Sequence, residues 1–257
     1  GAAGRMGQEV VKAVCSEPET VLVGALDSKA AEDTLTLPDG SGKVPFSADV
    51  SQILTGCQAD VLVDFTIASA IMSTVRAAAE KGVNLVIGTT GLSPDDVGKI
   101  EQLSIARNIG VVIAPNFALG AVIMMHLSKI AAKYLDYAEI IELHHDKKVD
   151  APSGTALNTA KEMAKYRGKP FLEPAATGEK QESRGQLVEG VTLHSVRLPG
   201  LLAHQEVIFG ASGQTLTIRH DSISRECFMP GVILAIKEVV KRKGLVVGLD
   251  NLLGLQG

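Results

Sequence analysis

The 257-residue sequence has few cysteines and no excess of positive charge. Its 3 cysteines, Cys15, Cys57 and Cys227, are scattered and show no CxxC spacing, so neither a disulfide framework nor a zinc site can be built from them. Lys and Arg total 25 against 29 Asp and Glu, a net charge of −4, which argues against a general nucleic-acid binder. Scattered cysteines are typical of a reducing compartment, and we expect a cytoplasmic protein.

An uninterrupted membrane span is also missing. Residues 108–128 contain no Lys, Arg, Asp or Glu, a stretch long enough to cross a bilayer. Pro115 and Asn116 interrupt it, which favours a buried strand, a polar break and a helix from about Ala118. The opening GAAGRMG has no signal-peptide pattern, and we expect a short strand to precede it in the natural protein.

With 46% hydrophobic residues, the chain can bury one or two cores, and disorder is excluded. Apolar runs of strand length alternate with helical stretches in the first half, which predicts an α/β fold with a Rossmann-like, doubly wound parallel sheet. The predicted strands are Thr20–Leu26, Asp60–Phe65, Asn84–Ile87 and Ile109–Ala114, and the predicted helices are Arg5–Ser16, Ser69–Lys81 and Pro94–Arg107.

Shorter strands separated by Gly and Pro fill the second half and predict a smaller, largely antiparallel α+β domain. We expect strands at Ala138–His144, Val191–Arg197, Gln205–Phe209 and Thr215–His220, a helix at Thr155–Tyr166, and a long mobile loop at Arg167–Gly190. A final helix, Pro230–Arg242, ended by Gly244, is expected to return to the first domain. The predicted domains are residues 1–117 with 228–257, and residues 118–227.

Glycines at positions 1, 4 and 7 let the backbone turn tightly and approach a pyrophosphate at the start of the next helix. Asp27 ends the apolar run VLVGAL, where a Rossmann fold places the carboxylate that binds the adenine ribose. The alternative interpretation of Asp27 is an ordinary turn residue. No Arg follows it, so NADH is slightly favoured, although Lys29 leaves NADPH open.

The stretch ELHHDKKVDAPSGTA, residues 142–156, holds a basic cluster inside an acidic protein. His144, His145 and Lys148 can bind an anion or exchange protons, and Ser153 opens a helix whose N-terminus suits a carboxylate. The alternative is a solvated charged loop followed by a helix cap. Arg197 and His204 are further candidates to face a substrate.

These motifs together resemble a known family. HHxxKVDAPSGTA after an acidic strand, with GAAGRMG, VDFT (63–66), GTTG (88–91) and PNF (115–117), is similar to the 4-hydroxy-tetrahydrodipicolinate reductase (dihydrodipicolinate reductase) family over essentially the whole chain. The resemblance implies NAD(P)H-dependent reduction of a cyclic dicarboxylate on the diaminopimelate route to lysine. It also implies a dinucleotide-binding first domain, a second domain for substrate binding and tetramerisation, and a homotetramer.

The resemblance assigns roles residue by residue. His144 would be the catalytic acid/base and Lys148 the proton donor, with Lys147 as a possible second lysine. His145, Gly154 and Thr155 would hold the substrate carboxylates. The cofactor would be lined by Gly1, Ala2, Ala3, Gly4, Arg5, Met6, Asp27, Gly88, Thr89, Thr90, Ala114, Pro115, Asn116 and Phe117, and no metal site is expected.

Two other classes of protein stay open at this point. A semialdehyde dehydrogenase would share the nucleotide-binding fold but needs an activated cysteine nucleophile, and none of the three cysteines lies in a basic cluster. A non-catalytic nucleotide sensor would keep the glycine loop but would not need His144 and Lys148.

Overall fold

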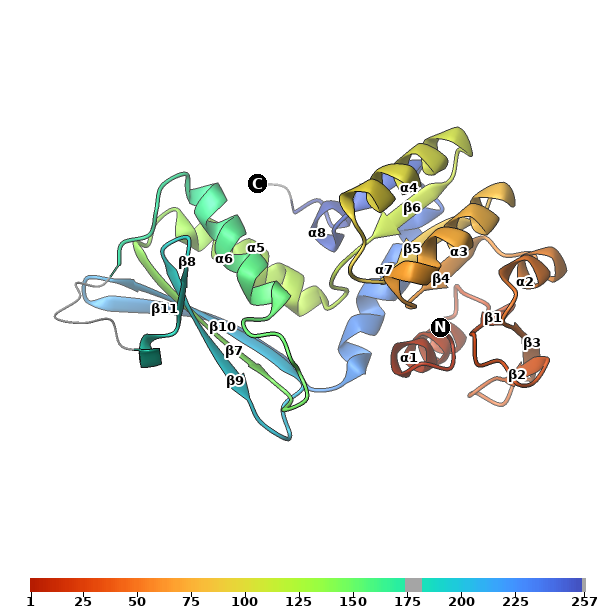
Figure 1. Cartoon of the computed structure of the whole chain (residues 1–257), viewed down its shortest axis with the longest axis horizontal. Coiled ribbons are helices and arrows are strands. Elements are labelled where there is room, and N and C mark those ends of the chain that lie inside the picture. Colours follow the sequence, from red (N-terminus) through yellow and green to blue (C-terminus); the bar gives the residue numbers. More distant parts are fainter. Residues whose placement is uncertain (174–181, 256–257) are drawn as a thin grey trace. The chain divides into compact units, whose positions relative to one another are not determined.

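The computed structural model describes residues 1–173 and 182–255. The chain folds into two compact units (Figure 1). The first consists of Gly1–Leu119 and Arg225–Gly257, and the second of Gly120–Ser224. Both contain helices and strands, which confirms the predicted α/β class.

A four-stranded sheet with the order β12-β6-β5-β4 forms the centre of the first unit. Its strands are β4 (Val61–Asp64), β5 (Asn84–Ile87), β6 (Gly110–Ile113) and β12 (Gly244–Val247). All pairings are parallel. Leu85, Val86 and Val112 in the two central strands are fully buried, as expected for apolar strands covered on both faces. The predicted parallel sheet is therefore confirmed.

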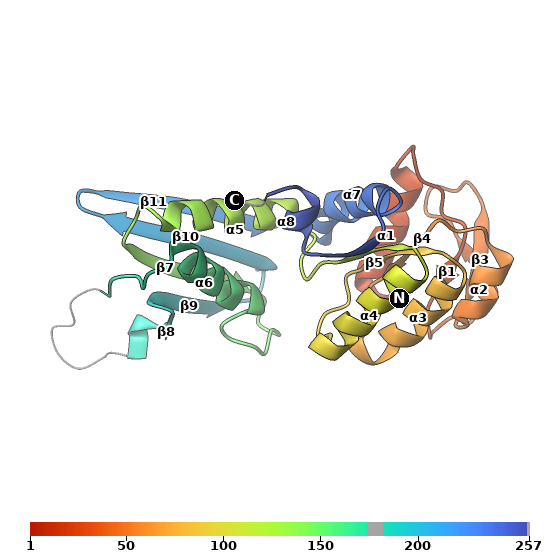
Figure 2. The same cartoon turned by 90° about the horizontal axis from the view of Figure 1, so that it is seen from above.

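Helices cover both faces of this sheet (Figure 2). One side carries α3 (Ala68–Glu80) and α4 (Pro94–Ala106), and the other carries α1 (Arg5–Ser16) and α7 (Met229–Val239). Leu85 and Ile87 of β5 pack in one core with Ile71, Val75 and Ala78 of α3. The alternation of strand and helix thus produces the doubly wound arrangement that the sequence predicted.

The sequence predicted the start of α4 correctly and the end of α7 incorrectly. α4 begins as expected, because Ser93 forms a capping box with Asp96 and Pro94 occupies the first turn. α7 ends at Val239 rather than Arg242. Gly244, expected to end that helix, instead begins β12 with φ of 83°. The residues GLVV continue as a strand because they pair in parallel with β6.

The predicted strand Thr20–Leu26 is wrong over most of its length. Only β1 (Ala25–Leu26) is a strand, and it belongs to a separate three-stranded sheet with the order β1-β3-β2. The other two strands are β2 (Thr34–Thr36) and β3 (Lys43–Ser47). β1 pairs with β3 over only two residues, and Val21 is 80% exposed. An apolar run becomes a strand only where a neighbour satisfies its backbone groups. The short helices α2 (Val50–Gly56) and α8 (Leu249–Leu252) were not predicted.

The second unit contains a five-stranded sheet with the order β11-β10-β7-β9-β8. Its strands are β7 (Tyr137–His144), β8 (Gln186–Val188), β9 (Val191–Arg197), β10 (Ala203–Ala211) and β11 (Gln214–Ser222). β7 and β9 pair in parallel and the other pairings are antiparallel, which confirms the predicted, largely antiparallel α+β architecture.

Two helices, α5 (Leu119–Ala132) and α6 (Gly154–Arg167), pack on one face of this sheet. Met124 of α5 and Met163 of α6 share a core with Ile140, Leu193 and Phe209 of the strands. No α-helix of the described part of this unit packs on the opposite face. Because strand side chains alternate, residues such as Glu139 and Ile208 lie on that uncovered face.

The expected loop Arg167–Gly190 contains structure that the sequence did not predict, namely the 3-10 turn η1 (Glu182–Arg184) and β8. Its middle, residues 174–181, lies outside the described residues. The uncharged stretch 108–128 divides into β6 and α5, as predicted. In the described ranges we find no helix whose length and apolar character would let it cross a membrane.

Candidate active site

Five charged or titratable side chains meet where β7 ends. Glu142 and His144 lie on β7, Arg197 ends the neighbouring β9, and Lys148 and Asp150 lie in the loop that leads to α6. The parallel register places His144 opposite Arg197. Residues 142 and 144 share one face of β7, because side chains alternate along a strand. We call these five residues the His144 cluster.

Glu142 is the buried centre of the His144 cluster, with a side chain that is 0% exposed. Its carboxylate accepts hydrogen bonds from Arg197 Nη2 to Oε1 at 2.8 Å, from Arg197 Nη1 to Oε2 at 3.0 Å, and from His144 Nδ1 to Oε2. The backbone N–H of Ser153 donates to Oε1 at 3.3 Å, and the Ser195 hydroxyl also donates. Burial raises the pKa of Glu142, but these hydrogen bonds outweigh it and lower the pKa to about 2. Glu142 is therefore ionised at neutral pH.

The contact with Glu142 determines which nitrogen of His144 can react. An ionised carboxylate only accepts hydrogen bonds, so Nδ1 of His144 carries a proton. Nε2 is then the ring atom that can exchange a proton with a bound molecule. The His144 side chain is 14% exposed, which leaves it accessible from one side.

Lys148 joins the cluster through Asp150. Lys148 Nζ donates to Asp150 Oδ1 at 2.8 Å, and this hydrogen bond lowers the pKa of Asp150 against the opposing effect of burial. The backbone oxygen of Asp150 accepts from Arg197 Nη2 at 2.6 Å, which ties the loop to β9. Lys147, by contrast, is exposed. The structure thus brings Lys148 into the cluster.

The N-terminus of α6 lies directly beyond this loop. Ser153 is buried and caps the helix, because its hydroxyl accepts from the backbone N–H of Ala156 at 3.2 Å. Gly154 is exposed and Thr155 half-buried, so the first turn faces solvent. The first N–H groups of a helix have no intrahelical partner and attract anions. His145 closes the turn before it, since its backbone oxygen accepts from Lys148 N at 3.1 Å.

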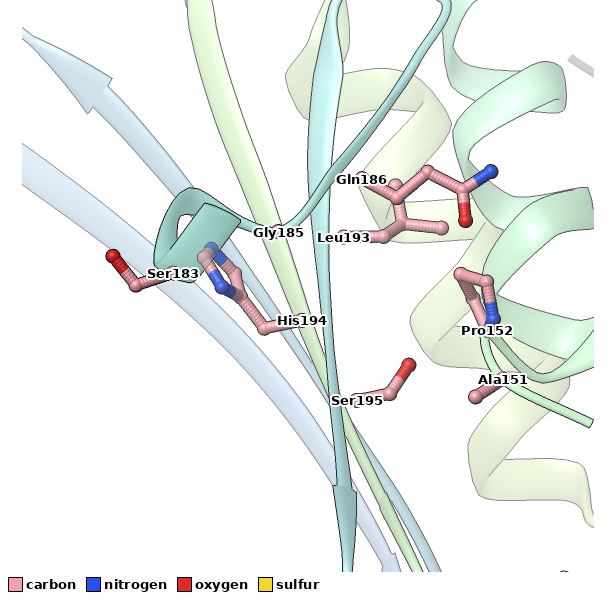
Figure 3. Close-up of a pocket in the computed structure, with 8 residues that line it drawn as sticks. All are labelled: Ala151, Pro152, Ser183, Gly185, Gln186, Leu193, His194 and Ser195. Carbon is pink, nitrogen blue, oxygen red and sulfur yellow. The ribbon is translucent and has the colours of Figure 1, made fainter. Parts of the chain in front are cut away.

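A surface pocket of ≈ 340 Å³ lies beside β9. Figure 3 shows Ser195 turned toward Ala151 and Pro152, while His194 turns toward Ser183. None of the predicted catalytic or substrate-binding residues lines this pocket, whose lining is Ala151, Pro152, Ser183, Gly185, Gln186, Leu193, His194 and Ser195. The alternation of His194 and Ser195 shows that β9 presents different chemistry on its two faces.

The sequence did not assign a role to Glu142. Its signal was the strand pattern AEIIELH, in which Glu142 is in phase with the core residues Ala138 and Ile140. Arg197, a candidate to face a substrate, is the ion-pair partner of Glu142. His204, the other such candidate, lies on the opposite face of the sheet, where Nδ1 is 2.7 Å from Asp221 Oδ1.

The glycine loop of the first unit is closely packed against α1. A Cβ on Gly7 would lie 1.9 Å from the backbone oxygen of Gly1, so only glycine fits at that position. Gly4 is the N-cap of α1 and no side chain caps this helix. The backbone N–H of Ala2 donates to Leu26 O at 2.9 Å, which holds the loop against β1. Arg5 and Met6 begin α1.

Asp27 immediately follows β1 and is tied to the glycine loop. Its Oδ2 accepts from Ala3 N and its Oδ1 from Lys29 N, each at 2.9 Å. Burial raises the pKa of Asp27, but the hydrogen bonds from Lys29 and Ala3 outweigh it, and the pKa lies below its usual value. Asp27 is therefore an ionised carboxylate beside a helix N-terminus, the arrangement that a dinucleotide ribose and pyrophosphate require.

A second buried carboxylate, Asp64 of β4, links the loops after β4 and β5, and a ring contact links the loop after β4 to the loop after β6. Asp64 accepts from Thr66 Oγ1 at 2.8 Å and from Thr89 Oγ1 at 2.6 Å. The ring of Phe65 lies where a Cβ on Gly88 would be, at 2.1 Å, and contacts Phe117 with 5.5 Å between ring centroids. The structure therefore places several predicted cofactor residues on these loops at the carboxyl edge of the sheet. Thr90 and Pro115 are exposed there, Asn116 is half-buried and Ala114 is buried.

The residues of the first unit fit a nicotinamide dinucleotide. The cradle formed by Gly1, Gly4 and Gly7 would be filled by any added Cβ, the α1 N-terminus lacks a side-chain cap, and Asp27 is ionised. These features suit a pyrophosphate and a ribose diol.

The thiol of Cys15 is not activated as a nucleophile. Burial raises the pKa of the Cys15 thiol, and nearby Asp39 raises it further, which makes Cys15 a poor nucleophile. Over residues 1–173 and 182–255, no three His, Cys, Asp or Glu side chains are grouped so that they could hold a metal ion.

Comparison with known proteins agrees with this geometry. Residues 1–117 match the family model described as dihydrodipicolinate reductase, N-terminus, and residues 120–253 match the one described as dihydrodipicolinate reductase, C-terminus. The 4-hydroxy-tetrahydrodipicolinate reductase of Dehalococcoides mccartyi is 60% identical over 99% of this chain and 97% of its own length. The enzyme of the same name from Moorella thermoacetica is 48% identical over 98% of this chain and 96% of its own length.

A solved structure supports the same relationship. The dipicolinate-bound dihydrodipicolinate reductase of Paenisporosarcina sp. TG-14 is 40% identical, with a TM-score of 0.86 over 98% of this chain and 96% of that chain. An aspartate semialdehyde dehydrogenase from Vibrio cholerae, only 14% identical with a TM-score of 0.53, shares the fold alone. Both family models and the level of identity lead to one conclusion: the chain belongs to the dihydrodipicolinate reductase family.

Proposed function

We propose that His144 and Lys148 carry the proton transfers of this reductase and that the N-terminus of α6 binds its substrate. As a member of its family, the protein is an oxidoreductase that reduces 4-hydroxy-tetrahydrodipicolinate to tetrahydrodipicolinate in diaminopimelate and lysine biosynthesis. The observation that carries the proposal is the His144 cluster, in which a buried, ionised Glu142 holds the imidazole beside a helix N-terminus.

The substrate is a cyclic dicarboxylate, and two anion-binding features lie next to His144. Gly154 and Thr155 expose the first turn of α6, and His145 precedes it in the same loop. We assign these three residues to the substrate carboxylates, because helix N-terminal N–H groups and an imidazole both suit a carboxylate. The dipicolinate bound to the Paenisporosarcina relative supports this substrate class.

Each catalytic residue has a separate task. Lys148 Nζ protonates the ring carbon next to the one that is reduced, and Asp150 holds the ammonium group in place. Loss of the 4-hydroxyl group and of a neighbouring ring proton as water gives the unsaturated ring that is reduced. His144 Nε2 supplies or relays the proton that the departing hydroxyl takes up, because Nδ1 is engaged with Glu142. The bound reduced nicotinamide supplies the hydride. The main contribution of the chain is to position the ring and to compensate the changing charge.

Single substitutions test these roles. His144→Ala and Lys148→Ala should each lower kcat by ~10²–10⁴, the range for a lost acid–base group. The measurement is nucleotide oxidation with the dicarboxylate substrate, together with binding of pyridine-2,6-dicarboxylate by calorimetry. Lys147→Ala is the matched control and should keep its turnover, because Lys147 is exposed. Turnover near the wild-type value in both test variants would refute the assignment and would leave nucleotide binding without acid–base chemistry.

For the cofactor we propose NADH or NADPH, with NADH slightly preferred. Asp27 is ionised and would repel a 2′-phosphate, whereas Lys29 beside it is exposed and can reach one. Gly1–Met6, Asp27, Gly88–Thr90 and Ala114–Phe117 are the proposed lining. Fluorescence titration with each nucleotide, in wild type and in Lys29→Ala, measures the preference, and the substitution should weaken NADPH binding only.

We further propose that the first unit binds the nucleotide and that the second binds the substrate and assembles a cytoplasmic homotetramer. The uncovered face of the five-stranded sheet supports this assembly, because it carries half-buried apolar side chains such as Ile208 and Ile141. A sheet face without a covering helix is stabilised when a second copy packs on it.

A further inference from the structure

The buried Glu142 and the half-buried Arg197 have no contact with the reacting atoms in the proposed mechanism. Glu142 is 0% exposed, and its partner Arg197 is 18% exposed. A buried ion pair gives little net stability, because desolvating two charges costs about as much as their attraction returns. Glu142 lies two residues before His144, which indicates that this ion pair has a role other than stability.

We infer that Glu142 and Arg197 are positioning residues, which fix the proton on Nδ1 of His144 and the orientation of its ring. The inference rests on the role proposed above for His144.

The first step of the argument is geometric. Glu142 Oε2 contacts His144 Nδ1, while both carboxylate oxygens accept from Arg197 at 2.8 and 3.0 Å. The bidentate pair fixes the plane of the carboxylate, since a guanidinium fork matches a carboxylate edge. Ser153 N holds Oε1 from the side of α6 at 3.3 Å. Glu142 therefore cannot turn away from His144 without leaving Arg197 and Ser153 unpaired.

The second step is electrostatic. A carboxylate next to an imidazole favours the protonated ring, and a guanidinium next to that carboxylate opposes this effect. The charged groups of the cluster are Glu142 on β7, Arg197 on β9, and Lys148 with Asp150 in the loop before α6. β10, on the other side of β7, places Ala203 opposite His144. Glu142 therefore presents its charge to Nδ1, and Arg197 and Ser153 hold that charge in place.

Glu142→Gln is the direct test. Glutamine has a single acceptor oxygen, for which Arg197 competes, so Nδ1 loses its acceptor. We expect kcat to fall by roughly 10–10³-fold. Nucleotide affinity, measured by fluorescence titration, should be unchanged.

A spectroscopic measurement separates positioning from a loss of folding. In protein labelled with ¹⁵N-histidine, the His144 signals report which ring nitrogen carries the proton, and Glu142→Gln should shift the population toward the Nε2–H tautomer. If the unpaired Arg197 prevents folding, the double variant Glu142→Gln/Arg197→Met leaves no buried charge without a partner. It should show the same loss of the Nδ1–H tautomer.

The chain offers a matched control on the same strand. Glu139 contacts His194 Nε2 at 2.9 Å and Arg184 Nη2 at 2.8 Å, but on the opposite face of the sheet. Glu139→Gln should leave kcat and the His144 tautomer unchanged.

An unchanged His144 tautomer in Glu142→Gln would overturn the inference. Wild-type turnover in His144→Ala would instead overturn the proposed function. The two failures are distinguishable, because the nitrogen spectrum locates the proton on His144 whether or not the ring takes part in turnover.

Discussion

At the scale of single residues, the proposed sites of the two units depend on different features. In the second unit, the proposed chemistry depends on a buried carboxylate that is held by four partners, namely His144 of β7, Arg197 and Ser195 of β9, and Ser153 before α6. In the first unit it depends on the absence of a side chain. Gly7 is the clearest case, because its hydrogen takes the place where a Cβ would overlap the backbone of Gly1.

Gly7→Ala should therefore disrupt the glycine loop. The added Cβ would lie 1.9 Å from Gly1 O, a backbone atom that cannot move without displacing the loop. We expect NADH binding to weaken at least roughly tenfold, equivalent to about 1.4 kcal/mol, as measured by fluorescence titration.

Gly98→Ala is the matched control for this change. Gly98 lies inside α4, and a Cβ there meets nothing within 4 Å. The substitution should leave NADH affinity unchanged and raise the free energy of unfolding by ~0.5–1 kcal/mol, because alanine is the better helix former. Equal NADH affinity in Gly7→Ala and wild type would show that the loop does not contact the nucleotide.

At the scale of elements, the sequence predicted α1, α3, α4, α6 and the strands β4 to β7 and β9 closely, because each carries its own periodicity and its own end signals. It was wrong at Thr20–Leu26 and at Gly244, where the outcome depends on which strand lies alongside. The side-chain contacts between elements could not be predicted from the sequence either. Arg167, the last residue of α6, is the strongest example, because its buried guanidinium holds the end of α5.

Arg167→Ala should destabilise the second unit. Arg167 Nη1 donates to the backbone oxygens of Ala132 at 2.5 Å and Leu135 at 2.8 Å, and Nη2 pairs with Asp136. Its side chain is 1% exposed, so the variant leaves buried carbonyl groups without donors. We expect the free energy of unfolding to fall by about 2–4 kcal/mol, measured by urea titration.

A surface ion pair provides the comparison for Arg167. Arg184 pairs with Glu139 at 2.8 Å, but the two side chains are 54% and 33% exposed. Arg184→Ala should cost no more than about 1 kcal/mol, because solvent screens such pairs. Similar losses in the two variants would contradict the structural role given to Arg167.

At the scale of the whole molecule, the pattern of strands and helices predicted a two-part α/β protein and the resemblance of its motifs implied a reductase, and membership of the family confirms that function. The assembly is a separate question, because it depends on one face of the five-stranded sheet. The opposite face is covered by α5 and α6, whose Met124 and Met163 fill the core. The uncovered face has no such helices among the described residues of the unit.

Ile208→Asp tests the proposed tetramer. Ile208 lies on β10 in alternation with the core residues Val207 and Phe209, so its side chain lies on the uncovered face. A carboxylate buried between two sheets is strongly unfavourable. Sedimentation should show a tetramer for the wild type and smaller species for the variant.

The control for assembly is Ile223→Asp, at a position that is 89% exposed and outside the sheet. It should sediment like the wild type. A tetramer that persists in Ile208→Asp would place the interface elsewhere on the molecule.

The sequence by itself determined the kinds of element, the glycine loop, the helix start at Ser153 and the residue types of the acid–base site. These are local properties, since periodicity, caps and turns depend on residues within a few positions of each other. Only the tertiary structure decided that Glu142 lies between His144 and Arg197, because Arg197 is 55 positions away and reaches it through the parallel pairing of β7 with β9. Which strands become neighbours depends on how the whole core packs, and that choice leaves no pattern in any one segment.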